Sequence, residues 1–253
     1  MKCSILFFLL FLSSLSVVFS QEKMVDEVTL KGAKKTNASF LKKLLYTQKG
    51  AALDSIKLQK DLVLLRRLPA VSYANYQVIY SKKESCTVFI TIEENFTLIP
   101  EVNVWTTTNN VFSYKLGLYE YNFLGKNITL GGFYQYNGFD SYGINFKAPQ
   151  LFSKTWGLAI NHQNWKSEEP LYFGNQTANY LYNNISFEVL GIHQFNLKNQ
   201  INFGVNLFKE KYQYLSGVTD PTIPQNLDLD KALLKAVYSY DDLTYFYQYT
   251  EGF

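Results

Sequence analysis

The sequence predicts a small α+β domain with the element order β-α-α-β-β, followed by about seven antiparallel transmembrane β-barrel strands. Aromatic residues make up 17% of the 253 residues, and 32 of the 43 Tyr, Phe and Trp side chains lie in residues 101–253. That half also alternates apolar and polar residues with a period of two, as half-buried strands do. Residues 24–95 instead contain two apolar stripes of helical spacing between short alternating segments.

Residues 1–20 have the layout of a secretion signal. Lys2 supplies a charged start, Ile5–Leu12 is an unbroken apolar run, and Val18–Ser20 provides a cleavage site. A signal anchor is the alternative, although the run is shorter than the ~20 residues that a spanning helix needs. Cleavage removes Cys3 and leaves Cys86 as the only thiol. No intramolecular disulfide is therefore expected.

Residues 21–95 are predicted to form the α+β domain. Its strands are expected at residues 25–30, 71–80 and 87–94. Asn37 or Ser39 is placed to cap the first helix, which Gly50 ends, and Asp54 caps a second helix that stops before Pro69. The two apolar stripes consist of Phe40, Leu41, Leu44 and Leu45 in the first helix and of Leu58, Leu62 and Leu65 in the second.

Residues 96–253 are predicted to form the barrel strands. The alternating segments centre on residues 114–118, 128–134, 142–146, 156–160, 185–189, 201–207 and 232–240. Their expected length of nine to eleven residues suits a tilted strand that crosses a bilayer. A soluble sandwich is the alternative, but its outer face normally carries many charges. The set expected to face lipid comprises Leu130, Ile144, Leu158, Phe187 and Phe203.

Several motifs resemble the bacterial surface antigen superfamily, which includes the BamA-type outer-membrane assembly factors. In the barrel half they are the turns Asn122–Gly125 and Pro149–Phe152. The first half resembles that family's polypeptide-transport-associated (POTRA) domain, with Leu30–Gly32, the break at Gly50 and the helix end at Leu65–Leu68. The family usually has sixteen strands and an Arg-Gly-Phe loop motif. The resemblance therefore implies that this chain is truncated within the barrel.

The resemblance implies a non-enzymatic protein that inserts or translocates other β-barrel proteins. It would lie in the bacterial cell outer membrane, with its N-terminal domain in the periplasm. Its implied partners are the lipid bilayer, unfolded β-barrel client proteins and accessory periplasmic lipoproteins, but no nucleic acid. Clients would add to exposed strand edges by β-augmentation. The expected edge residues are Val71, Tyr73, Tyr76, Val78 and Tyr80 in the first domain, and Tyr114, Leu116 and Leu118 in the first barrel strand.

No catalytic, cofactor or metal site is expected. The only histidines, His162 and His193, have no ligand spacing around them, and the net charge of +3 indicates no particular partner. The basic pairs Lys34-Lys35, Lys42-Lys43 and Arg66-Arg67 are expected to form a solvated face. Two other functions stay open: a passive outer-membrane pore or secretion channel of the same architecture, and a secreted soluble β-rich binding module.

Overall fold

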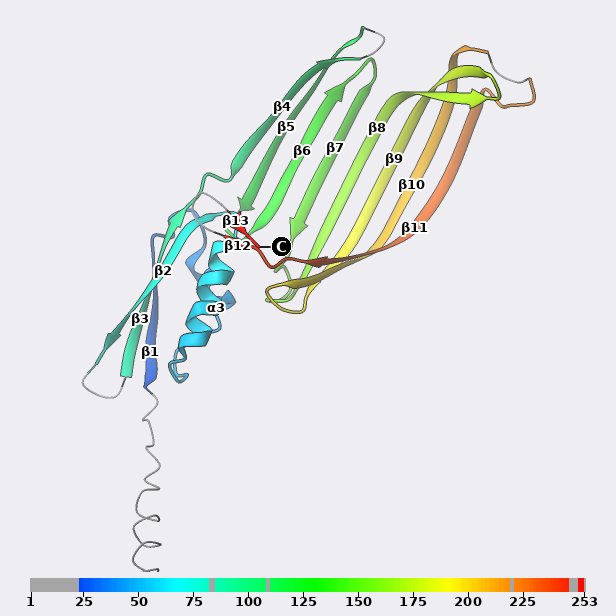
Figure 1. Ribbon diagram of the computed structural model, residues 1–253. Coiled ribbons are helices and arrows are strands. Elements are labelled where there is room, and N and C mark those ends of the chain that lie inside the picture. Colours follow the sequence, from blue (N-terminus) through cyan, green and yellow to red (C-terminus); the bar gives the residue numbers. More distant parts are fainter. Residues whose placement is uncertain (1–22, 82–84, 108–109, 219–220, 246–249, 253) are drawn as a thin grey trace, which may run out of the picture.

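The computed structural model describes residues 23–81, 85–107, 110–218, 221–245 and 250–252 (Figure 1). The expected signal segment lies outside the described residues. The chain forms a small N-terminal unit, residues 23–94, and one large open sheet, and the unit lies below one end of this sheet (Figure 1). Within the described ranges, no helix is long and apolar enough to cross a membrane.

The N-terminal unit has the predicted β-α-α-β-β order. Its elements are β1 (Met24–Lys31), α2 (Ala38–Leu44), α3 (Ser55–Arg66), β2 (Val71–Tyr80) and β3 (Ser85–Glu94). The central strand is β3, which pairs parallel with β1 and antiparallel with β2. Both remaining strands are therefore edges of a three-stranded sheet.

Side-chain caps start both helices. The Asn37 carbonyl oxygen accepts the backbone N–H of Phe40 at 2.9 Å, and the Asp54 carboxylate accepts that of Ile56 at 2.8 Å. Each bond satisfies a donor that has no partner within the helix. The first helix ends at Leu44, earlier than the predicted end at Gly50, which lies in the following turn with φ 79°.

The core of the N-terminal unit forms between the helices and the sheet. The predicted helical stripes are buried there, together with residues of the central strand: Leu41, Leu44, Leu45, Leu58, Leu62, Leu65, Val88 and Ile90. Leu62 is 7% exposed and Leu65 is fully buried. Burial of each of these side chains contributes about 1.5–3 kcal/mol to the stability of the unit.

The large sheet has eight strands in chain order, all antiparallel. They are β4 (Leu98–Thr106), β5 (Phe112–Phe123), β6 (Ile128–Tyr136), β7 (Asp140–Ala148), β8 (Trp156–Phe173), β9 (Gln176–Gln194), β10 (Asn199–Gly217) and β11 (Asn226–Tyr240). A separate pair, β12 (Thr244–Tyr245) and β13 (Thr250–Glu251), follows near α3 (Figure 1). The seven predicted strands are β5–β11. A sandwich needs two packed sheets, and these eight strands form one sheet, so the sandwich alternative is wrong.

The strand β4 corrects one prediction. Tyr114, Leu116 and Leu118 do not form a first-strand edge, because their strand β5 is paired on one side with β4 and on the other with β6. The sequence obscured β4 because Pro100 interrupts it. Proline is tolerated at a sheet edge where its missing N–H faces away from the partner strand. The Thr107 N–H donates to the Val111 carbonyl, so the odd-numbered residues of β4 direct their backbone N–H and C=O groups toward β5. The even-numbered residues, which include Pro100, direct theirs to the free side.

The lengths of the later strands correct another prediction. β6 and β7 have nine residues, but β8, β9, β10 and β11 have 18, 19, 19 and 15. The expected nine to eleven residues cover only the stretch of each strand in which one face is apolar. The strands continue beyond a cross-strand row of polar residues, Lys166, Asn183, Lys211 and Asp228. Beyond this row the alternation that marked the strands in the sequence is lost.

The register places all five predicted lipid-facing residues on the same face, here called the outer face. Ile144 pairs with His162, which pairs with Phe187, and Leu158 reaches Phe203 through Gly191. Ile144 is 56% exposed and Phe187 is 48% exposed. The opposite, inner face carries Gly, Asn, Ser and Thr together with several charged side chains. One apolar face and one polar face are what a barrel wall in a bilayer requires.

Candidate functional site

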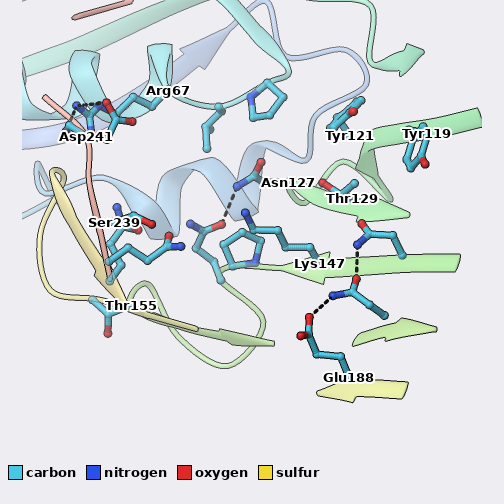
Figure 2. A pocket seen from close by; sticks show the side chains of 18 of the residues that line it. Arg67, Tyr119, Tyr121, Asn127, Thr129, Lys147, Thr155, Glu188, Ser239 and Asp241 are labelled. Carbon is cyan, nitrogen blue, oxygen red and sulfur yellow. Dashed lines mark hydrogen bonds and ion pairs between the residues drawn. The ribbon is translucent and has the colours of Figure 1, made fainter. Parts of the chain in front are cut away.

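A cavity of about 1060 Å³ lies between the helices of the N-terminal unit and the inner face of the sheet (Figure 2). We call it the vestibule. Leu44, Leu64, Leu68 and Pro69 form its apolar wall. The opposite wall is polar and consists largely of inner-face side chains of β5–β11, among them Tyr119, Tyr121, Thr129, Asn145, Lys147, Asn161, Glu188, Lys235 and Ser239. The vestibule therefore has one apolar wall and one hydrogen-bonding wall.

A chain of polar contacts crosses the inner face beside the vestibule. The Asn145 side-chain amide donates to the side-chain oxygen Oδ1 of Asn161, and the Asn161 Nδ2 group donates to the Glu188 carboxylate at 2.8 Å. Lys235 on β11 donates to the other Glu188 oxygen at 2.8 Å. Its register partner on the intervening strand β10 is Gly204, which has no side chain to obstruct this contact. The chain links four strands and leaves the Glu188 side chain 10% exposed.

The turn between β5 and β6 docks onto a loop of the N-terminal unit. The Asn122 amide donates to the Thr36 hydroxyl at 3.0 Å, and the Asn37 N–H donates to the Gly125 carbonyl at 2.9 Å. Gly125 has φ 67°, and a Cβ there would lie 2.5 Å from the Lys35 carbonyl oxygen. Only glycine suits this conformation at this distance. The Asn-Phe-Leu-Gly motif is thus a junction between the two units.

Glu94, the last residue of β3, holds the loop that carries Thr36. Its carboxylate accepts the N–H of Lys35 at 3.0 Å and the N–H of Thr36 at 2.7 Å. Burial alone would raise the pKa of Glu94, but these backbone hydrogen bonds and the Thr36 hydroxyl outweigh it and lower the pKa below its ordinary value. The ionised carboxylate therefore stabilises the loop.

Arg67 joins the end of α3 to the other side of the sheet. Its Nη2 donates to the carbonyls of Asp241 and Leu243, both at 3.0 Å, and its Nη1 donates to that of Leu197. The Arg67 side chain is only 14% exposed, so the predicted solvated face is wrong at this position. The sequence carries no signal for these contacts, because all three carbonyls lie far along the chain. A further contact runs from Lys154 Nζ to the Leu45 carbonyl at 2.7 Å.

The edge strand β2 contains the five residues predicted to bind clients. The Ser81 N–H donates to the Ser85 carbonyl at 2.8 Å, which turns the odd-numbered residues of the strand toward β3. Tyr76, Val78 and Tyr80 therefore direct their backbone groups to the free side. Val71 is 3% exposed and Tyr73 is 39% exposed, and both lie at the end nearer the large sheet.

The opposite edge of this small sheet is partly covered. The N–H of Val25 on β1 donates to the Ala51 carbonyl at 2.9 Å, and the Val25 carbonyl accepts the Gly50 N–H at 2.8 Å. These bonds occupy the start of the β1 edge. The β2 edge from Tyr76 to Tyr80 is thus the more accessible one.

The strand β4 forms one edge of the large sheet and β11 forms the other. On β4 the residues whose backbone groups face the free side include Val102, which is 67% exposed, and Val104, which is 59% exposed. Only three residues separate the end of β3 from the start of β4. The hairpin β2–β3, which contains the free edge of the small sheet, therefore leads directly into the edge strand of the large sheet.

Comparison with known proteins gives a likeness of fold. No protein-family model and no curated protein matches the chain. A crystal structure of BamA from Haemophilus ducreyi lacking POTRA domains 1–3 matches 87% of this chain and 44% of its own, with 16% identity and a TM-score of 0.62. CdiB from Acinetobacter baumannii matches 87% of this chain and 43% of its own, with 12% identity and a TM-score of 0.52.

CdiB from Escherichia coli is also similar, covering 87% of this chain and 42% of its own, with 10% identity and a TM-score of 0.55. At these identities the likeness establishes the fold. The chain spans less than half the length of each of the three structures. The predicted resemblance to the BamA-type architecture is therefore confirmed as a partial barrel of that fold.

Proposed function

We propose that this chain captures unfolded outer-membrane proteins through its strand edges and passes them toward the membrane for insertion or translocation. The observation that carries the proposal is the pair of accessible edges on β2 and β4, joined through β3 and a three-residue connection. Backbone groups at such edges bind an extended strand whatever its sequence. An assembly factor for many different clients needs this kind of recognition.

The outer face supports placement in an outer membrane. Its apolar band on β8–β10 ends at charged residues, where Lys209 on β10 lies 3.6 Å from Asp228 and 3.7 Å from Asp230 on β11. Such a charged outer face belongs in water rather than lipid. In this placement the long strand ends project outside the cell and the N-terminal unit lies in the periplasm. The proposed lipid contacts are those of Leu130, Ile144, Leu158, Phe187 and Phe203.

The function is tested by blocking one edge without disturbing the sheet. Val102 turns its N–H outward, so Val102→Pro removes a donor from the free edge of β4 but no bond to β5. Val102→Thr keeps the N–H and serves as the matched control. Each variant in detergent micelles is mixed with an unfolded barrel protein that carries a photo-reactive residue in one strand. Crosslinks to β4 should fall with Val102→Pro and persist with Val102→Thr.

Other outcomes distinguish the alternatives. Equal crosslinking by both variants contradicts capture at β4. Ion conductance across planar bilayers without any client capture supports the passive pore or secretion channel. Complete extraction of the protein from membranes by carbonate supports the secreted binding module.

A further inference from the structure

We infer that Arg66 ends the client-binding edge of β2, so that a client strand pairs with Tyr76–Tyr80 and stops before Ala74. This inference rests on the proposed function and assigns a positioning role to one residue. Arg66 is the last residue of α3 and lies beside the edge strand. It is not part of the solvated basic face that the sequence predicted.

The hydrogen bonds of Arg66 occupy a backbone group that a client would need. Arg66 Nε and Nη2 both donate to the Ala74 carbonyl, at 3.2 and 2.7 Å. Ala74 has the same parity as Tyr76, Val78 and Tyr80, so this carbonyl points to the free side of β2. A client N–H arriving there meets an acceptor that is already bonded. The guanidinium group also lies 5.8 Å from the centre of the Tyr73 ring, which helps to fix its position.

A β-bulge reinforces the stop. The pairing of β2 with β3 skips Ser72, between Val71 and Tyr73, and the Ser72 hydroxyl donates to the Glu93 carbonyl at 3.0 Å. A bulge bends the strand and interrupts the regular row of backbone groups on which an added strand depends. The regular free edge therefore runs from Ala74 to Tyr80, and Arg66 occupies its first outward acceptor.

The usable edge defines the partner that fits. Three outward residues offer three N–H donors and three carbonyl acceptors to an extended polypeptide. A client segment of about five residues pairs with all of them, because outward groups recur every second residue. Binding at this edge should therefore stop strengthening once the client segment exceeds that length. The client is then held on the part of β2 that lies away from the vestibule.

The experiment compares two fluorescent peptides of alternating apolar and polar sequence, five and nine residues long. Fluorescence anisotropy measures their Kd for the full chain in detergent micelles. The wild-type protein should bind both peptides within twofold of each other. Arg66→Ala frees the Ala74 carbonyl, and one added hydrogen bond should tighten the nine-residue peptide roughly fivefold while leaving the shorter peptide unchanged. Lys60→Ala removes a cation from the exposed side of the same helix and should behave as wild type.

Two further variants keep the test decisive. If Arg66→Ala lowers the melting temperature, Arg66→Lys retains the charge but provides only one donor group, and should give a smaller gain for the longer peptide. Val78→Pro removes an outward donor within the edge and should weaken both peptides. If the nine-residue peptide binds more tightly than the five-residue peptide by the same factor in wild type and in Arg66→Ala, Arg66 does not end the client-binding edge. Client capture at β2 is then still supported. Failure of every variant to bind either peptide, or no effect of Val78→Pro, contradicts capture at β2 itself and overturns the stop with it.

Discussion

The side-chain amide of Asn122 donates a hydrogen bond to the hydroxyl oxygen of Thr36 at 3.0 Å, and both residues are buried. Thr36 belongs to a loop before α2, whereas Asn122 is the second-to-last residue of β5. The side-chain oxygen Oδ1 of Asn122 also accepts the Asn127 N–H at 3.0 Å, which closes the turn between β5 and β6. One side chain thus shapes a turn of the sheet and attaches the N-terminal unit to it.

Replacing Asn122 by Ala should loosen this attachment. The change removes the amide that donates to the buried Thr36 hydroxyl, and a hydrogen bond of this kind contributes about 0.5–1.5 kcal/mol. We expect faster proteolytic separation of the N-terminal unit from the sheet, with little change in the melting of either part. Asn175→Ala, at an exposed turn between β8 and β9, is the control. Identical cleavage rates for the two variants would contradict a docking role for Asn122.

Gly125→Ala should disrupt the junction between the N-terminal unit and the sheet, whereas Gly50→Ala should not. Gly125 and Gly50 both have positive φ, 67° and 79°, so alanine is strained at either position. At Gly125 the new Cβ also lies 2.5 Å from the Lys35 carbonyl oxygen, whereas at Gly50 nothing lies within 4 Å. Spin-label distances between the unit and the sheet should change in Gly125→Ala and not in Gly50→Ala. The reverse pattern would show that strain, not contact, governs the junction.

The loop that carries Thr36 should lose stabilisation in acid through Glu94. Its pKa is lowered in the folded protein, so its contribution is present above the ordinary value of 4.5 and is lost as pH falls through the lower folded value. The melting temperature of the N-terminal unit should therefore fall more steeply below pH 4.5 in wild type than in Glu94→Gln. Glu93→Gln, on the exposed side of β3, should keep the wild-type slope. Parallel curves for wild type and Glu94→Gln would contradict the assignment.

The sequence revealed the elements whose stabilisation is local. Asp54 and Asn37 are recognisable as caps because their partners lie within three residues, and β5–β11 are recognisable because alternation recurs along each strand. The contacts of Arg66 and Arg67 were not predictable in this way. Their acceptors are backbone carbonyls, which every residue has, so no sequence pattern distinguishes the eight-residue separation of Ala74 or the 174-residue separation of Asp241. Pro100 concealed β4 because proline usually argues against a strand.

The charged row on the outer face should mark where the membrane ends. Phe187 and Leu181 lie on the same face of β9, but Phe187 falls within the apolar band and Leu181 lies beyond the row of Lys166, Asn183 and Lys211. Arginine at a lipid-facing midplane position costs about 2–4 kcal/mol, and near an interface it costs little.

Phe187→Arg should therefore lower the denaturant concentration needed to unfold the protein in lipid vesicles, and Leu181→Arg should leave it nearly unchanged. Ser186→Arg, on the inner face beside Phe187, separates an effect of lipid from a general effect of charge and should cost less than Phe187→Arg. An equal large loss at Phe187 and Leu181 would mean that the charged row does not mark the boundary and that the long strands β8–β11 are immersed over their full length. No loss at either position would mean that these strands lie wholly in water.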